Sequence, residues 1–427
     1  MRLPGAQFCH DSNLRSAWHL PGGRNPSWPR ASTHNFRVNT PGRMDAEGTM
    51  NLTRRELLGF AGAALAQRTL SAAPAPTAQT VAVAKCATYS DAEVLANLKT
   101  MFDQLGGLGK LVRNKTVTVK LNLTGSPGQR FQGRPLGSTH YTHPQVIMAT
   151  AHLMGEAGAT RIRFVESAWA LSGPLEDYLL DSGWNVSQLT NSAKNVEFEN
   201  TNNLGKGKQY IRFKVPGQPY IFPAYDLNHA YHDTDVFVSM AKLKNHATCG
   251  VTLSMKNCFG ITPASIYGDD AGIEEPNEKP GSGRVSAMHG GRRGPSKSAP
   301  GELDPHSNRD AGYRMPRIVA ELNLARPVDL AIIDGVQSIA GGEGPWIRGL
   351  RYVEPGVLVA GLNPVNTDAV ATAVMGYDPR ASKGSAPFPM CDNTLLLAEK
   401  LGVGSADLSR IEVAGVPIAK AVYRFTV

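Results

Sequence analysis

Short apolar runs alternate with amphipathic segments through most of the chain from residue 80 onward. Runs rich in Val, Ile and Ala have the length of buried strands, and they cover residues 80–87, 117–123, 161–166, 236–238, 327–334 and 357–360. Segments with helical spacing lie between or after them, at 90–105, 144–155, 174–182, 313–324 and 365–375. This alternation predicts an α/β fold, a layered α/β/α structure with a mostly parallel central sheet.

Two parts of the chain interrupt this order. Residues 185–232 are polar and turn-rich, and strands at 196–199 and 210–215 are expected to form a smaller antiparallel excursion. Gly, Pro, Ser, Arg and Glu dominate residues 263–310, which show no sustained apolar period. A loop of this length inside a domain is usually functional or disordered. We therefore expect an irregular insertion, either a lid over one end of the sheet or a disordered surface loop.

The first 79 residues differ in character from the rest. Residues 1–49 are rich in Pro, Arg, Gly, Asn and Ser, which predicts a disordered or untranslated extension. Residues 50–79 contain Arg54-Arg55, a short apolar run and then small residues with prolines, as a twin-arginine export signal does. The run is too short for a transmembrane helix; an internal amphipathic helix is the alternative. We expect residues 80–427 to form a single domain, exported by the twin-arginine translocase to the periplasm or beyond, with no stable membrane span after cleavage.

Composition and charge narrow the classes of protein. A hydrophobic content of 41% and a charged content of 19% indicate a globular chain. The formal net charge is +8, but residues 1–79 hold nine Arg and four acidic residues, so +5 belongs to them and +3 to the remainder. No basic stripe is interleaved with aromatic residues, which argues against nucleic-acid binding. No C-x-x-C pair occurs among the five cysteines, which argues against a zinc ribbon or an iron–sulfur cluster.

The stretch from residue 235 to 261 holds the densest group of candidate site residues. Its apolar start, Val236 to Val238, leads into Lys242, Lys244 and His246. If the strand continues through these residues, the alternation of side chains puts all three on one face. Solvated lysines and a structural histidine are the alternative interpretation.

A segment with helical spacing follows, from about residue 248 to 258, and Gly260 stands where a glycine would end it. Lys256 and Asn257 lie near the end of this segment. A helix N-terminus favours anions through its free N–H groups, and the neighbouring cations add to that preference. The stretch therefore predicts a site for a carboxylate or a phosphate.

Other candidates lie at the carboxyl ends of predicted strands, where ligands bind in open α/β sheets. Lys120 and Asn122 end one strand and Asp334 ends another, while Glu343 lies in a glycine-rich connection that matches neither a P-loop nor a dinucleotide fingerprint. His143 and His289 are additions from loops. Asp368 falls in the first turn of a helix, where an acid is favoured in any case.

Several blocks of the sequence carry a family resemblance. They are VKLNLTG, THPQVIMATAHLMGEAGA, DVFVSMAKLKNHATCGVTLSMKNCFG, RIVAELNLARPVDLAIIDGVQSIAGGEGP and VLVAGLNPVNTDAVATAVMGYDP. Together, over roughly residues 80–380, they resemble the bacterial and archaeal family called domain of unknown function 362. That family has no settled activity. Many of its members carry a ferredoxin-like module with two four-cysteine clusters, and the cysteines for it are absent here.

The same family is distantly similar to the N-terminal domain of nickel-pincer lactate racemases, which use His and Lys around a tethered cofactor. That similarity implies that Lys242, Lys244, His246 and Lys256 belong to a site.

The sequence thus predicts an exported enzyme that acts on a small anionic organic substrate by Lys/His acid–base chemistry, with room for a metal whose identity is open. We expect His246, Lys244 and Asp334 to be catalytic. The expected substrate-binding residues are Lys120, Asn122, Lys242, Lys256, Asn257 and Glu343. A non-catalytic periplasmic anion-binding or assembly protein is the alternative, and a purely structural exported protein is a third interpretation. The spacing of Cys86, Cys249, Cys258 and Cys391 defines no disulfide pairing.

Overall fold

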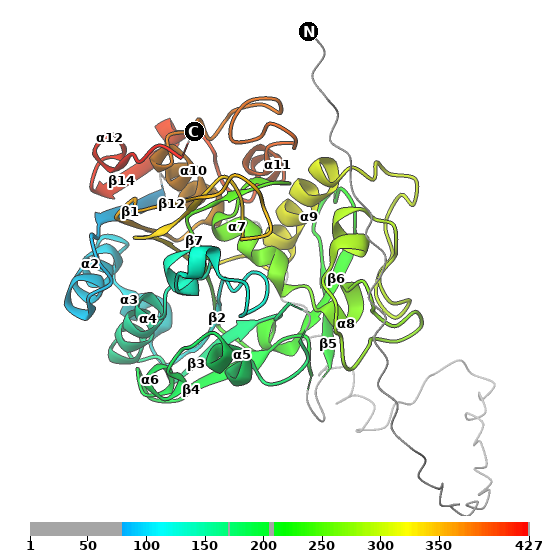
Figure 1. The fold of residues 1–427 in the computed structure, drawn as a ribbon, viewed down its shortest axis with the longest axis horizontal. Helices are drawn as coiled ribbons and strands as arrows, with labels where there is room; N and C mark the ends of the chain where they lie inside the picture. Colours follow the sequence, from blue (N-terminus) through cyan, green and yellow to red (C-terminus); the bar gives the residue numbers. More distant parts are fainter. Residues whose placement is uncertain (1–78, 170, 205–208, 426–427) are drawn as a thin grey trace, which may run out of the picture. The chain divides into compact units, whose positions relative to one another are not determined.

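The structure is a computed structural model that describes residues 79–169, 171–204 and 209–425, and its centre is an eight-stranded sheet (Figure 1). In the order β14-β1-β13-β10-β7-β2-β3-β4, its strands are Ile411–Gly415, Gln79–Lys85, Val357–Gly361, Leu330–Gly335, Val236–Lys242, Thr116–Lys120, Arg161–Glu166 and Val196–Asn200. β13 pairs antiparallel with β1 and β10, and the other neighbouring pairs in this sheet are parallel. The predicted α/β class with a mostly parallel sheet is confirmed.

Each face of the sheet packs on its own apolar core, because successive side chains of a strand point to opposite faces. Val119 and Met240 belong to one core, which also contains residues of helices α2 (Asp91–Gln104), α3 (Leu108–Val112), α4 (Pro144–Glu156), α5 (Leu175–Asp181) and α6 (Val186–Thr190). Val165 and Ala241 belong to the other, with α7 (Leu253–Asn257), α8 (Ala264–Tyr267), α9 (Ala311–Ala325), α10 (Pro364–Val374), α11 (Thr394–Lys400) and α12 (Ile418–Ala421). The result is the predicted layered arrangement.

Local sequence signals account for several helix starts. The His143 side chain accepts a hydrogen bond from the N–H of Gln145 at the start of α4, and Pro144 takes the first helical position. Asn363 caps α10 in the same way, with Pro364 next in the chain. Both caps follow the sequence patterns that predicted these helices.

The polar stretch after α6 contributes to two different sheets, which corrects part of the prediction. β4 pairs parallel with β3 and forms an edge of the main sheet instead of an antiparallel excursion. β5 (Tyr210–Lys214) pairs antiparallel with β6 (Ala224–Asn228), a strand that was not predicted. β4 joins the main sheet by pairing with β3, and the local sequence of β4 does not specify which strand it pairs with.

The stretch after β7 also differs from the prediction. β7 ends at Lys242, and a short hairpin of β8 (Asn245–His246) and β9 (Gly250–Val251) follows. The expected helix from 248 to 258 is therefore only the five-residue α7, continued by the 3-10 turn η4 (Cys258–Ile261). Gly250 has a φ of 74°, a conformation that glycine adopts without strain and that favours the hairpin over a helix.

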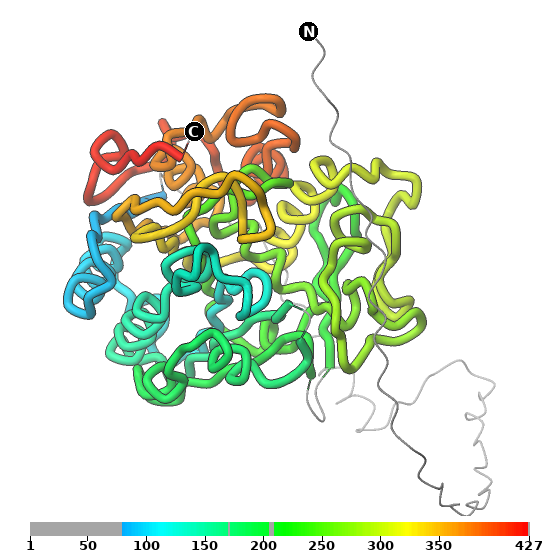
Figure 2. Tube along the Cα trace, in the orientation of Figure 1, coloured from blue at the N-terminus to red at the C-terminus, as the bar shows by residue number. Residues whose placement is uncertain are grey.

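The irregular segment 263–310 packs beside the β5–β6 pair (Figure 2). The N–H of Leu303 donates to the carbonyl of Ile221 at 2.9 Å, and Arg212 donates to the carbonyl of Ser298 at 2.8 Å. Arg314 of α9, fully buried, pairs with Glu302 at 2.8 Å. A single π-helical turn, η5 (Val285–His289), lies within the segment. These contacts tie the insertion to the rest of the fold.

Smaller elements complete the described chain. They are the antiparallel pair β11 (Ser338–Ala340) and β12 (Arg351–Val353) and the 3-10 turns η1 (Phe131–Gly133), η2 (Leu136–Ser138), η3 (His229–Tyr231) and η6 (Leu408–Arg410). Within the described ranges no helix is long and apolar enough to cross a membrane. The predicted leader lies outside the described residues, except for Gln79, the first residue of β1.

Candidate functional site

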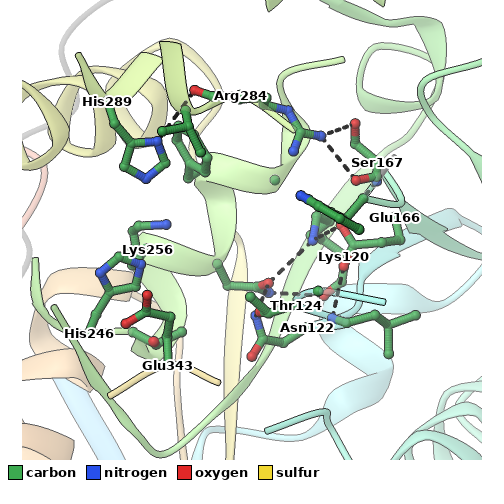
Figure 3. Close-up of a pocket in the computed structure, with 18 of the residues that line it drawn as sticks. Lys120, Asn122, Thr124, Glu166, Ser167, His246, Lys256, Arg284, His289 and Glu343 are labelled. Atoms are coloured by element: carbon green, nitrogen blue, oxygen red, sulfur yellow. Dashed lines mark hydrogen bonds and ion pairs between the residues drawn. The ribbon is translucent and has the colours of Figure 1, made fainter. Parts of the chain in front are cut away.

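A pocket of about 390 Å³ opens beyond the carboxyl ends of β2 and β3 (Figure 3). Segments far apart in the sequence line it: the ends of these strands, the β8–β9 hairpin, α7 with η4, the insertion, and the loop between β11 and β12. Its charged and imidazole lining residues are Lys120, Glu166, His246, Lys256, Arg284, His289 and Glu343. The volume is that of a small-molecule site.

One wall of the pocket is built on an ion pair. Nζ of Lys120 lies 2.5 Å from Oε1 of Glu166 and donates to the carbonyl of Leu121 at 2.6 Å. Glu166 also accepts the N–H groups of Leu123 and Ser167, at 2.9 and 3.0 Å. Burial lowers the pKa of Lys120, while Glu166 acts in the opposite direction. The charges of this pair are therefore already satisfied within the protein.

Asn257 joins two predicted residues to that wall. Its Nδ2 donates to the carbonyl of Lys120 at 3.2 Å and to the hydroxyl of Ser239 at 3.1 Å. Its Oδ1 accepts from Nζ of Lys120 at 3.3 Å and from Nδ2 of Asn122 at 3.1 Å. Lys120, Asn122 and Asn257, all predicted to bind substrate, therefore lie together at the pocket.

The opposite wall carries Lys256, His246 and Glu343, which Figure 3 shows as one group. Nζ of Lys256 lies 4.2 Å from the ring centroid of Phe259 and makes no hydrogen bond or ion pair within the described part of the chain. Burial lowers its pKa. Glu343 accepts the N–H of Ala247 at 3.0 Å and the indole N–H of Trp346 at 3.2 Å. Lys256 is thus a cation without a protein acceptor.

Two histidines of the pocket have opposite tautomers. Nδ1 of His246 accepts the backbone N–H of Thr248 at 3.1 Å, so its neutral ring carries the proton on Nε2. Nδ1 of His289 faces the carbonyl of Arg284 at 3.3 Å and must donate, so its Nε2 holds the lone pair. Burial lowers the pKa of His246 well below its ordinary value and that of His289 to about 4, and Lys256 adds to both shifts. Both rings are neutral at pH 7.

Arg284 comes from the insertion and is fixed by carbonyl groups. Its Nε donates to the carbonyl of Thr262 at 2.7 Å, and Nη2 donates to the carbonyl of Ser167 at 3.0 Å and to the Ser167 hydroxyl. No carboxylate lies within ion-pair distance of it among the described residues, and burial lowers its pKa to about 10. It is the second cation of the pocket that lacks a carboxylate partner.

The start of α7 determines where Lys256 lies. Oδ1 and Oδ2 of the buried Asp368 accept the N–H groups of Ser254 and Met255, both at 2.8 Å. Leu253, just before them, has a φ of 44°, a strained conformation for a residue with a side chain. Asp368 lies past the first turn of α10, so its predicted place is wrong, and its carboxylate has a structural role at the start of α7 instead.

Lys242 and Asp334 lie outside the pocket lining, in a buried pair 2.8 Å apart. Lys242 follows Met240 by two residues and points to the same face of the sheet, whereas Lys120 shares the opposite face with Val165. Lys242, Lys244 and His246 were predicted to share one face of a strand that continued through them. β7 ends at Lys242, so that prediction is wrong.

Lys244 is also absent from the lining. Its ammonium donates to the carbonyls of His140 and Glu343, at 2.7 and 3.1 Å, and to the hydroxyl of Thr124 at 3.3 Å. These three acceptors use all three of its protons. Lys244 therefore holds the loop that presents Glu343. His143, one of the two loop histidines predicted to join the site, caps α4 instead of entering the pocket. Its ring stacks on Tyr89, with the ring centroids 3.5 Å apart.

Several lining residues were not among the predicted site residues. They include Thr124, Glu166, Ser167, Trp169, Phe259, Arg284 and Trp346. Glu166 ends a predicted strand, so its position was a usable signal. Arg284 and the two tryptophans lie in irregular segments, where no periodicity distinguishes a pocket residue from a surface one.

Neither metal-binding clusters nor paired cysteines appear in the described ranges. No group of three or more His, Cys, Asp and Glu residues there could hold a metal ion. Cys86, Cys249, Cys258 and Cys391 are buried free thiols.

Comparison with known proteins identifies a family, one relative and one solved structure. The model of a family described as a domain of unknown function (DUF362) matches residues 117–373. The chain is 26% identical over 302 residues to a thylakoid-associated protein of Synechocystis sp., covering 70% of this chain and 76% of that protein. A crystal structure of a Thermotoga maritima protein aligns with a TM-score of 0.32 and 11% identity. That alignment covers 64% of this chain and 56% of the other, so the chain spans less than two thirds of its length.

Proposed function

The chain belongs to the family described as a domain of unknown function, DUF362, and we propose that its pocket binds a small organic anion and transfers protons on it. The observation that carries the proposal is the ammonium of Lys256. It lines a pocket, it is half-buried, and it has no acceptor among the described residues. A buried charge without a partner costs free energy, and an anionic ligand would remove that cost.

The histidine pair supports chemistry beyond binding. Nε2–H of His246 is a hydrogen-bond donor and Nε2 of His289 is an acceptor, so His289 can take a proton from the substrate while His246 donates a hydrogen bond to the negative charge that develops. The substrate would lose a proton to Nε2 of His289 and regain one from the same ring, which makes the product an isomer of the substrate. No oxidant or reductant is required.

Anion binding would also prepare these histidines for their roles. Their pKa values are lowered by burial and by the charge of Lys256. A negative charge beside Lys256 offsets the effect of the Lys256 ammonium on the two histidines and raises both of their pKa values toward the working pH. His289 then becomes a better base in the complex than in the free protein.

The binding step is tested by calorimetric titration of the full chain with butyrate and with inorganic phosphate. Replacing Lys256 with Met should weaken the binding of whichever probe binds by about tenfold or more. Lys99→Met is the matched control, because Lys99 is exposed on α2 and outside the pocket lining. Equal affinity in wild type and Lys256→Met contradicts the proposal.

The chemical step is tested in D₂O with lactate, malate and tartrate, whose carbon next to the carboxylate carries a proton. Wild-type protein should exchange that proton for deuterium, and NMR would detect the exchange. His246→Gln and His289→Gln should bind the same acid without exchanging it. Binding without exchange by the wild type would instead support the alternative function, a non-catalytic anion-binding protein. That alternative is favoured by one observation: Asp334, predicted to be catalytic together with His246, is paired with Lys242 and lies outside the pocket lining.

We further propose that the protein acts outside the cytoplasm, on the basis of Arg54-Arg55 and the apolar run after them. Replacing both arginines with Lys should retain the full-length chain in the cytoplasm, as cell fractionation would measure. Unchanged fractionation of the variant would contradict the proposed route.

A further inference from the structure

Two cations of the pocket, Lys256 and Arg284, share one feature: neither has a carboxylate within ion-pair distance among the described residues. The remaining lining charges differ from them. Lys120 and Glu166 neutralise each other, and the two oxygens of Glu343 accept N–H groups. The pocket therefore offers two separate positions for negative charge and not one.

The two positions lie near the same aromatic ring. Nζ of Lys256 is 4.2 Å from the ring centroid of Phe259, and Cζ of Arg284 is 5.9 Å from the same point. The two cations can be no farther apart than the sum of these distances. A molecule of a few carbon atoms spans that gap.

The two cations also destabilise each other in the empty pocket. After burial, Arg284 is among the charges that lower the pKa of Lys256, and both add to the lowering at His289. A ligand with one negative charge would leave one of the cations unpaired. A ligand with two would neutralise both.

We propose that the ligand of this pocket is a short organic dianion, with one anionic group on Lys256 and the other on Arg284. The inference rests on the proposed function, because it assigns the substrate class of the same pocket. A short dicarboxylate and a phosphorylated carboxylate share this chemistry. Nε and Nη2 of Arg284 already donate to Thr262 and Ser167, so Nη1, with two N–H donors, is left to contact either group.

The experiment compares ligands of equal carbon number on the wild-type chain by calorimetry at pH 7. Succinate should bind about tenfold to hundredfold more tightly than butyrate, and glutarate more tightly than pentanoate, since one charged hydrogen-bonded contact is gained. Phosphoglycolate added to the series separates the two sources of dianion: whichever of it and succinate binds more tightly identifies the second group.

Variants locate the second anionic group. Arg284→Met should reduce the preference for succinate over butyrate to about onefold, and Arg284→Lys, which keeps the charge, should retain part of it. Arg292→Met is the matched control, since Arg292 is an exposed arginine of the same insertion, and it should keep the full preference. The comparison on the wild type stands even if Arg284→Met is unstable.

The outcomes separate the two proposals. Equal affinity of the wild type for succinate and butyrate overturns the dianion while leaving an anion site at Lys256. A preference for succinate that survives in Arg284→Met also overturns it. Binding of none of these acids or phosphates contradicts the proposed function itself.

Discussion

Nζ of Lys242 lies 2.8 Å from Oδ2 of Asp334, and neither side chain is exposed to solvent. The two residues are direct neighbours in register on the parallel strands β7 and β10, so their side chains share one face of the sheet. Tyr89 completes the group, donating to Oδ1 of Asp334 at 2.8 Å and accepting from Lys242 at 2.9 Å. This pair is part of the buried structure at the carboxyl ends of two central strands.

Lys242→Met should lower the free energy of unfolding by about 3–5 kcal/mol, because it leaves the carboxylate of Asp334 buried without its cation. Urea denaturation measures the change. Lys297→Met is the control, since its pair with Glu274 is exposed and is worth about 1 kcal/mol or less. Lys242→Met should retain the wild-type affinity for the pocket ligand. A large loss of affinity in Lys242→Met without loss of stability would contradict the structural role of the Lys242–Asp334 pair.

Gly260→Ala should damage the wall formed by Lys120 and Glu166. A Cβ at this position would lie 2.8 Å from Nζ of Lys120, closer than such atoms approach, and 3.1 Å from Oε1 of Glu166, a tight contact. We expect a loss of about 1–3 kcal/mol in unfolding free energy, together with weaker ligand binding. Gly294→Ala, where a Cβ would meet nothing within 4 Å, should change stability by about 0.5 kcal/mol or less. If Gly260→Ala and Gly294→Ala changed the free energy of unfolding by similar amounts, the close approach of Gly260 to Lys120 would be refuted.

His289 should make stability depend on pH on the acid side of neutrality. Its pKa is about 4 in the folded protein, against 6.5 in the unfolded chain, so only the unfolded chain binds its proton between these values. The contribution of His289 to stability should therefore fall as the pH decreases from about 6.5 toward 4, by at most about 1.4 kcal/mol per pH unit. Chemical denaturation at several pH values measures the slope, which should be smaller in His289→Gln. His152→Gln, at an exposed position of α4, should keep the wild-type slope.

Asp368→Ala should loosen the start of α7 and thereby the position of Lys256. It removes the acceptor of two backbone N–H groups, which should cost about 1–3 kcal/mol of unfolding free energy. Ligand affinity should fall as well, and Asp368→Asn should keep part of both because it keeps one acceptor oxygen. Asp407→Ala, at the exposed cap of η6, should lower stability and affinity by less than Asp368→Ala does. Unchanged affinity in Asp368→Ala would mean that Lys256 is positioned by other contacts.

The sequence by itself determined the secondary structure of the sheet layers and the general place of the site. The apolar runs became strands because a parallel sheet covered on both faces needs apolar side chains on both faces. Lys120, Asn122 and Asn257 were identified as candidates because strand ends and the following helix lie at one edge of such a sheet. These signals are local, and they are readable without knowing which strands are neighbours.

Only the tertiary structure decided which charged residues share a cavity. Lys120 and Lys242 both end strands, yet one side chain faces the α7 layer and the other the α4 layer. Lys120 is in register with Ser239, and Lys242 lies three residues further along β7, an odd offset that reverses the face. Arg284 and His289 reach the pocket from an insertion without periodicity, held there by carbonyl contacts with distant residues. Register, strand order and the path of a long loop arise from packing between remote parts of the chain, and therefore no local pattern specifies them.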